Sequence, residues 1–285
     1  MTAQLLDGER VAAQIRAGLA ERVAALAIRG ITPGLGTLLV GDDGPSARYV
    51  AMKHQDCAEI GISSIHAHLP ADASQAEVLA MIDRFNGDPS VDAYLLQYPF
   101  PAGFDYAEAL ERVYPNKDVD GLHPVNLGRL LLGETGPRPC TPVGIVELLS
   151  AHEIEVAGRH VVIIGRGLTI GRPLAALLTL KQPWANAAVT VVHTGFASPG
   201  DLIRLADIVI VAAGSPGLVR ADMVKPGAVV VGAGVSFEGK KLLSDLAEDV
   251  ADVAAWITPR IGGVGPMTRA VLLRNCVEAA ERATT

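Results

Sequence analysis

Tyr49 and Lys53 are the first pair of side chains in this sequence whose types and spacing could do chemistry. Residues four apart lie one turn apart on the same face of a helix. On an ordinary surface helix the two would be a solvated pair. In a mostly apolar pocket, burial would lower the pKa of the lysine, which could then transfer protons. The tyrosine beside it could stack on a flat heterocycle.

Two further segments carry polar side chains at positions suited to binding. Gln97 follows an apolar segment that predicts a buried strand, and open α/β sheets bind ligands at the carboxyl ends of their strands. Asp118 and Asp120 lie in a loop closed by Gly121 that resembles the first half of an EF-hand. Because Leu127 stands where the bidentate glutamate belongs, we expect no calcium and no other metal. The two carboxylates are better suited to accept hydrogen bonds from N–H groups of a ligand.

A glycine-rich turn, Gly165-Arg166-Gly167 with a further glycine at Gly171, joins a predicted strand at 160–164 to a predicted helix. Such turns bring backbone N–H groups close to a pyrophosphate at the start of a helix. The spacing is one residue longer than the usual dinucleotide fingerprint. A tight strand-to-helix turn without a ligand is the alternative.

The choice of cofactor is indicated by the end of the next predicted strand, where Val192 is followed by His193 and Thr194. NAD enzymes usually place a carboxylate here, against the ribose 2′-hydroxyl. This chain has none, and Arg166 lies in the glycine turn. A cation and a hydroxyl without a repelling carboxylate favour the 2′-phosphate of NADP.

A second glycine-rich segment, Gly262-Gly263-Val-Gly-Pro266-Met-Thr268, precedes the last predicted helix. It could be only a tight turn. Alternatively, its bare backbone could touch a cofactor or a substrate.

The composition excludes several classes of protein. Of 285 residues, 49% are hydrophobic, so the chain is not disordered. The formal net charge is −7 without a basic block, which argues against nucleic-acid binding. Three scattered cysteines support neither a disulfide framework nor a zinc site. We find no signal peptide and no stretch able to cross a bilayer, and we therefore expect a cytoplasmic globule without a membrane partner.

Strands alternate with helices along the whole chain, which predicts parallel β-α units and an α/β fold. Strands are predicted at 34–40, 62–68, 91–98, 160–164, 188–193, 207–212 and 228–231. The first helix covers about 11–26, the second is capped by Ser46 and ends at Gly61, and Ser74 with Glu77 forms a capping box for the third. Residues 114–136 predict irregular structure. A domain boundary follows, where Thr141 is expected to cap a bridging helix.

Taken together, these segments closely resemble the methylenetetrahydrofolate dehydrogenase/methenyltetrahydrofolate cyclohydrolase family. The stretches that carry the resemblance are Val40-Gly41 to Tyr49-x-x-x-Lys53, Gln97-Tyr-Pro-Phe-Pro101, Pro115-Asn-Lys-Asp-Val-Asp-Gly121, Pro139-Cys-Thr-Pro142, the turn at Gly165, and Gly262 to Thr268. They occur in the family's order from one end of the chain to the other.

The resemblance implies two α/β domains flanking a cleft. A folate-binding catalytic domain would cover 1–140, with the last helix, 266–285, packing back on it, and an NADP-binding Rossmann domain would cover 141–265. A homodimer formed through the Rossmann domain is also implied. The expected activity is oxidation of 5,10-methylenetetrahydrofolate by NADP, then hydrolysis to 10-formyltetrahydrofolate, within the one-carbon metabolism that supplies purine, methionine and histidine synthesis.

The resemblance also assigns residues. Lys53 matches the catalytic lysine, Gln97 its hydrogen-bond partner, and Asp120 the carboxylate that grips the pterin. The expected substrate-binding residues are Tyr49, Lys53, Gln97, Asp120, Gly262, Gly263 and Pro266. The expected cofactor-binding residues are Gly165, Arg166, Gly167, Gly171, His193, Thr194 and Val235.

Four departures from the family pattern all fall on the cofactor side. Gly167 replaces a frequent serine, Gly232 stands in Val-Gly-Ala-Gly for the familiar Ile-Asp-Val-Gly, Ser244-Asp-Leu246 replaces Gly-Asp-Val, and Arg260-Ile261 replaces Val-Pro. They bear on the affinity and selectivity for NADP more than on the folate site. Two alternatives remain open: a two-domain NAD(P)-dependent dehydrogenase of a small hydroxy or amino acid, and a catalytically silent cofactor-binding module.

Overall fold

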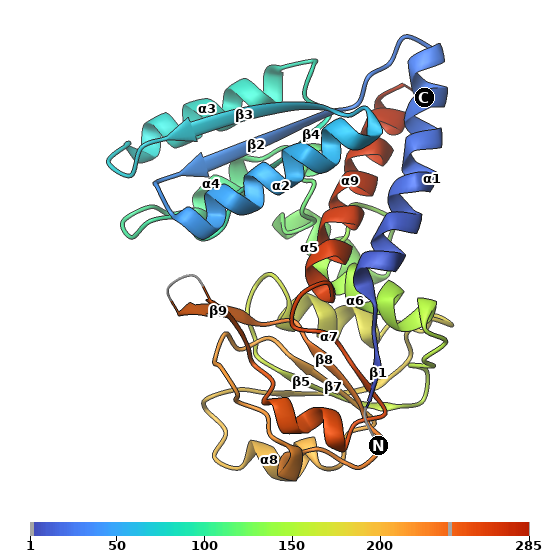
Figure 1. Cartoon of the computed structure of the whole chain (residues 1–285). Coiled ribbons are helices and arrows are strands. Elements are labelled where there is room, and N and C mark those ends of the chain that lie inside the picture. The colour runs from blue at the N-terminus through green and yellow to red at the C-terminus, as the bar shows by residue number, and fades with distance from the viewer. Residues whose placement is uncertain (1–2, 239–240, 285) are drawn as a thin grey trace. The chain divides into compact units, whose positions relative to one another are not determined.

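The computed structural model describes residues 3–238 and 241–284, and the chain divides into two compact units (Figure 1). The Lys53 unit comprises Gln14–Cys140 and Arg269–Thr285. The glycine-turn unit comprises Met1–Ala13 and Thr141–Thr268. Each unit is an α/β layer structure built on a parallel sheet, as the alternation of elements predicts.

The Lys53 unit contains a three-stranded parallel sheet in the order β3-β2-β4. The strands are β2 (Gly34–Val40), β3 (Ser63–Leu69) and β4 (Ala93–Leu96), and β2 is buried along its whole length. Leu38, Tyr94 and Leu96 of the sheet share a core with Ile82 and Phe85 of α3 (Gln75–Gly87). The other helices are α2 (Gly44–Ile60), α4 (Tyr106–Arg112), α5 (Pro124–Leu132) and most of α1 (Gly8–Ile28) and α9 (Val264–Ala283).

Local capping signals set the ends of several helices in this unit. The expected capping box is present: Glu77 donates its N–H to Ser74 Oγ at 3.2 Å, and Ser74 donates its N–H to Glu77 Oε2 at 2.7 Å. Gly61 ends α2 in the left-handed conformation, at φ 83°. The predicted cap at Ser46 is wrong, because α2 starts at Gly44 and the side chain of Asp43 accepts the N–H of Ser46.

The segment 114–136 is more regular than its sequence suggests. Residues Pro115–Lys117 form a short 3-10 helix, and Pro124–Leu132 form α5. The residues that indicated a loop are the boundaries of α5: the side chain of His123 caps its start, Pro124 occupies its first turn, and Gly133 closes it at φ 72°.

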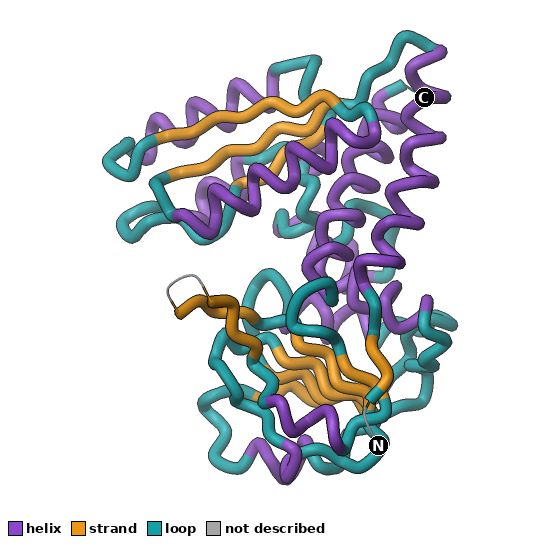
Figure 2. The backbone as a smooth tube through the Cα atoms, in the orientation of Figure 1, coloured by secondary structure: helices purple, strands orange, loops and turns teal. Residues whose placement is uncertain are grey.

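The glycine-turn unit contains a six-stranded parallel sheet in the order β1-β11-β8-β7-β5-β6. Its strands are β1 (Gln4–Leu5), β5 (His160–Ile164), β6 (Ala188–Val192), β7 (Ile208–Val211), β8 (Val229–Gly232) and β11 (Trp256–Ile257). Figure 2 shows the strands of the chain in orange. Because the chain proceeds from β5 to β6 on one side and then to β7 on the other, the order reverses at β5. Ligands of such sheets bind at this point, beyond the carboxyl ends of the strands.

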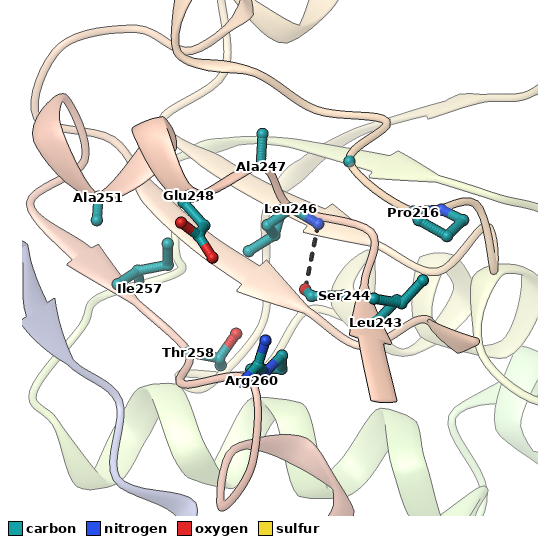
Figure 3. Close-up of a pocket in the computed structure, with 11 residues that line it drawn as sticks. Pro216, Leu243, Ser244, Leu246, Ala247, Glu248, Ala251, Ile257, Thr258 and Arg260 are labelled. Carbon is teal, nitrogen blue, oxygen red and sulfur yellow. Dashed lines mark hydrogen bonds between the residues drawn. The ribbon is translucent and has the colours of Figure 1, made fainter. Parts of the chain in front are cut away.

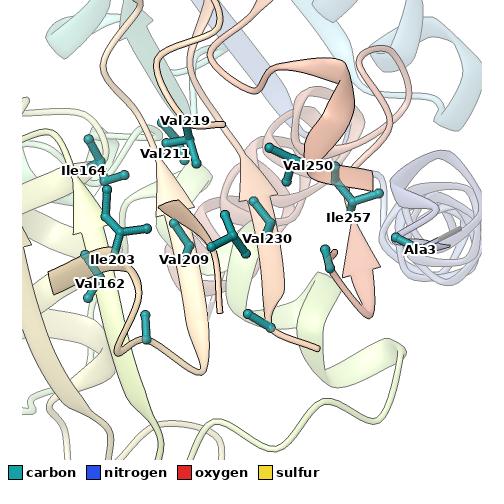
Figure 4. Packing of buried hydrophobic residues seen from close by; sticks show 14 of the residues in the cluster. Ala3, Val162, Ile164, Ile203, Val209, Val211, Val219, Val230, Val250 and Ile257 are labelled. Carbon is teal, nitrogen blue, oxygen red and sulfur yellow. The ribbon is translucent and has the colours of Figure 1, made fainter. Parts of the chain in front are cut away.

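Valine and isoleucine side chains fill the core of this unit. Val162, Val209 and Val230 of the central strands pack with Ile203 and Val250 from the connections (Figure 4). The remaining elements are α6 (Cys140–Ala151), α7 (Gly171–Leu178), α8 (Pro199–Ile203), two 3-10 turns (Ala221–Met223 and Glu248–Asp252) and the antiparallel pair β9 (Val235–Glu238) and β10 (Lys241–Ser244).

The structure differs from the sequence-based ranges at two junctions. The first residues of the chain join the glycine-turn unit rather than the unit of residues 14–140, because β1 pairs with β11. Thr141 is not the cap of α6, since that helix begins at Cys140; the hydroxyl of Thr141 lies 3.0 Å from the hydroxyl of Thr268 instead. In the part of the chain that the structure describes, no helix is long and apolar enough to cross a membrane.

Candidate active site

Lys53 is buried on α2 and is held by Gln97, which follows β4. Lys53 as a whole is 4% exposed, and its Nζ donates to Gln97 Oε1 at 3.0 Å. Gln97 in turn donates its Nε2 to the carbonyl of Tyr98 at 2.9 Å, which fixes the orientation of the amide. The backbone N–H of Gln97 bonds the carbonyl of Leu38 on β2, so the sheet itself places this residue.

Tyr49 lies one helical turn before Lys53, and the centre of its ring is 5.3 Å from Lys53 Nζ. Burial raises the pKa of Tyr49 to about 12, so its phenol keeps its proton at neutral pH. The spacing of the two residues along the sequence therefore does bring an aromatic ring beside a buried amine.

Lys53 and Asp120 influence each other's protonation. Burial lowers the pKa of Lys53, and the charge of Asp120 partly offsets this. Burial raises the pKa of Asp120, and the charge of Lys53 partly offsets that. Both groups are thus shifted toward their neutral forms, which makes a proton easier to move at neutral pH.

The two carboxylates of the loop at 118–121 have different surroundings. Asp118 is 3% exposed and accepts hydrogen bonds from Gly121 N at 3.0 Å, His123 N at 2.8 Å and Asn126 Nδ2 at 2.9 Å. Its oxygens therefore serve the loop, contrary to the expectation that both carboxylates face a ligand. The half-buried Asp120 is the carboxylate of this pair that the structure sets near Lys53.

A buried ion pair beside these residues was not anticipated from the sequence. Arg269 of α9 donates its Nε to Asp56 Oδ2 at 2.6 Å, and both side chains are 9% exposed. The arginine's charge opposes the rise that burial causes in the pKa of Tyr49, and it adds to the fall that burial causes in the pKa of Lys53. The available signal was Asp56 itself, which lies three residues after Lys53 and hence on the same side of its helix.

The glycine turn after β5 is closely packed at both of its ends. Gly165 has φ 120°, and a Cβ there would lie 2.2 Å from the carbonyl oxygen of Ala212. A Cβ on Gly171 would lie 2.1 Å from the carbonyl oxygen of Gly165. Gly167, by contrast, faces open space. α7 begins at Gly171 without a side-chain cap. In its first turn the N–H groups of Arg172 and Leu174 donate to the carbonyls of Gly167 and Ile170, and Pro173 has no N–H, so Gly171 is the residue of this turn that could offer its N–H to an anion.

The residues after β6 lie next to this turn. Strands β5 and β6 pair Ile164 with Val192, so the chains that follow them leave the sheet at the same edge. Arg166 and Thr194 are exposed, and His193 Nδ1 accepts the N–H of Gly195 at 3.0 Å. This edge, with its bare backbone and its arginine, fits the predicted dinucleotide. Val235 begins β9, and its side chain lies outside the described structure.

Asp245 organises a second loop of the glycine-turn unit. The fully buried carboxylate accepts the backbone N–H groups of Ala213, Gly214 and Ser215 at 2.7 to 2.9 Å. These residues follow β7, the strand beside β5. A Cβ on Gly234 would lie 1.9 Å from Asp245 Oδ2, which accounts for that glycine.

Two departures from the family pattern pack against each other. A Cβ on Gly232 would lie 3.0 Å from Leu246 Cδ1 and 3.3 Å from Ser244 Oγ. The absence of a side chain at Gly232 thus leaves room for the side chains of Ser244 and Leu246. Leu246, Ser244 and a third departure, Arg260, line a pocket of about 500 Å³ that Thr258 and Glu248 also border (Figure 3).

The second glycine-rich segment belongs to the glycine-turn unit. Its Gly262 carbonyl accepts the N–H of Glu9, and a Cβ on Gly8 would lie 1.8 Å from the carbonyl oxygen of Gly263. Pro266 is buried in the first turn of α9. Packing against the start of α1 explains the small residues here, and their contact with a substrate stays a prediction.

Comparison with known proteins covers both units. Residues 6–120 match the family model for the tetrahydrofolate dehydrogenase/cyclohydrolase catalytic domain, and residues 139–284 match the model for the NAD(P)-binding domain of the same family. The bifunctional protein FolD of Syntrophotalea carbinolica is 59% identical over 99% of this chain and 97% of its own length.

Two solved structures resemble the chain over 99% or more of both lengths. The bifunctional FolD dehydrogenase/cyclohydrolase of Campylobacter jejuni is 42% identical, with a TM-score of 0.94. The Trypanosoma brucei dehydrogenase-cyclohydrolase, solved with NADP and an inhibitor, is 37% identical, with a TM-score of 0.93.

Proposed function

Because the chain belongs to the tetrahydrofolate dehydrogenase/cyclohydrolase family, it is a bifunctional enzyme that uses NADP, and we propose that Tyr49, Lys53, Gln97 and Asp120 serve both of its reactions. It oxidises 5,10-methylenetetrahydrofolate and hydrolyses the methenyl product to 10-formyltetrahydrofolate. The family match over both units does not favour a small-acid dehydrogenase or a silent module.

The dehydrogenase step depends mainly on alignment. NADP, when bound, accepts a hydride from the methylene carbon. Tyr49 supplies a flat apolar face for the folate, and Asp120 accepts N–H bonds from the pterin edge. Holding the reacting carbon in place in this way removes much of the entropic part of the barrier.

The hydrolysis step needs protons to move. Water adds to the methenyl carbon and one C–N bond of the ring breaks. The water oxygen becomes the formyl oxygen and loses two protons, of which one goes to the nitrogen that leaves and one to solvent. Lys53 suits this task because burial lowers the pKa of its amine and Gln97 Oε1, 3.0 Å away, orients it. This buried contact is the observation that carries the proposal.

One assay tests the function directly. The protein is mixed with methylenetetrahydrofolate and NADP, and both the reduced cofactor and the transient methenyl absorbance are followed. We expect both signals, with the methenyl absorbance decaying faster than it does without enzyme. Absence of cofactor reduction would contradict the dehydrogenase activity, and decay at the spontaneous rate would contradict the cyclohydrolase activity.

The remaining proposals concern the cofactor and the assembly. The 2′-phosphate of NADP is bound by Arg166, in the phosphate turn that Gly165, Gly167 and Gly171 form. His193 and Thr194, which follow β6, and Val235, at the start of β9, complete the proposed cofactor-binding set. The protein forms a homodimer through the glycine-turn unit, where β6 lies at one edge of the sheet in the described residues and could pair with a strand of a second copy. Light scattering coupled to gel filtration tests the dimer, and a monomeric mass would contradict it.

A place in cytoplasmic one-carbon metabolism follows from the same family resemblance.

A further inference from the structure

Asn275, on α9, joins two backbone segments around Asp120. Its side chain is 7% exposed, and Nδ2 donates to the carbonyl of Val119 at 2.9 Å and to the carbonyl of Arg138 at 3.1 Å. The Sγ atom of Cys140 lies 3.5 Å from the same nitrogen. One buried amide thus contacts both backbone segments, the loop at 118–121 and the segment at 138–140.

These two segments are packed closely against each other. Cys140 donates its N–H to the carbonyl of Asp120 at 3.2 Å and its Sγ to the carbonyl of Val119 at 3.3 Å. A Cβ on Gly121 would lie 2.2 Å from the carbonyl carbon of Arg138. The carbonyl of Val119 belongs to the peptide plane that joins Val119 to Asp120. Fixing this carbonyl therefore fixes the orientation of the backbone from which the Asp120 side chain projects.

We propose that Asn275 is a positioning residue for Asp120, an inference that rests on the proposed folate-binding role of that carboxylate. Asp118 holds the loop from within, through the N–H groups of Gly121 and His123. Asn275 holds it from outside, through the carbonyls of Val119 and Arg138. Without the amide, the part-buried carbonyl of Arg138 loses this donor and the carbonyl of Val119 keeps only the weak Cys140 thiol, so the loop shifts to regain hydrogen bonds. A small displacement is enough to weaken a pair of directional hydrogen bonds to a planar ligand.

The first test compares two buried asparagines of the same unit. Asn86 is also 7% exposed, and it donates Nδ2 to the carbonyl of Arg112 at 2.9 Å. Asn86 Oδ1 also accepts the Tyr94 hydroxyl at 2.7 Å and the N–H of Tyr114 at 2.9 Å. Asn275→Leu and Asn86→Leu therefore both remove a buried amide with several hydrogen bonds, at different places in the unit. We expect Asn275→Leu to raise the KM for methenyltetrahydrofolate about tenfold, the usual effect of one buried hydrogen bond, while the NADP Kd changes less than about twofold. Asn86→Leu should leave both constants nearly unchanged. An equal rise in KM in the two variants would overturn the proposal.

The second test asks whether Asn275 acts through Asp120. In a double-mutant cycle, Asn275→Leu should add less than about twofold to the KM of Asp120→Asn, because the carboxylate that it positions is already altered. Independent, multiplicative effects would refute the positioning role and leave that of Asp120 intact. If Asp120→Asn alone leaves KM unchanged, the proposed role of Asp120 is itself wrong. Asn275→Ala removes the donor without adding bulk or charge, and it replaces the leucine variant in both tests if that variant does not fold.

Discussion

The two units of this enzyme prepare their sites by opposite means. In the Lys53 unit, the site consists of side chains: an amine, an amide, a phenol and a carboxylate. Burial shifts the pKa of the amine, the phenol and the carboxylate, and the charges of the amine and the carboxylate partly offset each other's shifts. In the glycine-turn unit, the decisive feature is where side chains are missing. Gly165 and Gly171 let backbone approach backbone, and the open Gly167 leaves its own backbone accessible.

This difference predicts different failures. A change of charge or of donor at Lys53 or its neighbours in the site should slow proton transfer while leaving the fold and the cofactor turn intact. An added methyl group in the glycine turn should disturb cofactor binding while leaving hydrolysis, which needs no cofactor, intact. The two activities of one chain thereby serve as internal controls for each other.

The largest effect is expected for Lys53→Met, which keeps the length of the side chain and removes its titratable group. Cyclohydrolase activity should fall by about 10²- to 10⁴-fold, the usual range for loss of a general acid or base, and NADP binding should be unchanged. Lys117→Met is the control, since Lys117 Nζ donates only to backbone in its described contacts, the carbonyls of Phe85 and Asp88. Hydrolysis by Lys53→Met at the wild-type rate, after subtraction of the spontaneous reaction, would show that Lys53 is not catalytic.

Gly165→Ala should give the next largest effect. The new Cβ would collide with the carbonyl of Ala212, at a φ of 120° that only glycine adopts easily. Overpacking of this kind costs about 1–3 kcal/mol, so we expect a lower Tm, weaker NADP binding and slower dehydrogenation. Gly200→Ala, on α8 of the same unit, is the matched control, because its Cβ meets only ordinary contacts at 3.7 Å or more. Similar NADP affinities for the two variants would mean that the packing of this turn does not shape the cofactor site.

Arg166→Gln sharpens the comparison on the cofactor side, because here a side chain rather than bare backbone should matter. A hydrogen bond from a charged group contributes about 1.5–3 kcal/mol. The preference for NADP over NAD should therefore fall by about 10- to 100-fold, measured as the ratio of kcat/KM with the two cofactors. Arg172→Gln, an exposed arginine on the same turn-and-helix segment, is the control. An unchanged ratio would assign the selectivity to other residues.

The smallest effect concerns pH and is confined to the Lys53 unit. His54 Nε2 and His66 Nδ1 lie 3.2 and 2.8 Å from Thr37 Oγ1, and burial lowers the pKa of both histidines. Because the folded state binds protons less readily than the unfolded chain, stability is fully present above a pH of about 6.5 and is lost as the pH falls through the folded-state values. Tm measured from pH 8 to pH 5 should decline, and His66→Gln should make the decline shallower. A Tm profile with the same slope in this variant would rule out His66 as a contributor.

Much of the local structure was predictable from neighbouring residues. The strands at 34–40 and 160–164 match β2 and β5 because their continuous apolar runs suit strands buried on both faces. The capping box at Ser74 and the end of α2 at Gly61 depend on groups only a few residues apart. The Tyr49–Lys53 pair follows from helical periodicity alone.

The sequence by itself determined what is local: the alternation of strands and helices, the glycine turn and the four side chains proposed to handle the folate. Only the tertiary structure decided that Asp118 and Asp120 differ in role, because Asp118 accepts hydrogen bonds from His123 and Asn126 once the loop and α5 are folded. It likewise revealed the pairs Arg269–Asp56 and Asn275–Val119, whose members lie more than 150 residues apart. Periodicity and spacing describe the order of groups along one element. Which buried donor meets which acceptor depends on how separate elements pack, because each buried polar group takes its partner from whatever the fold brings beside it.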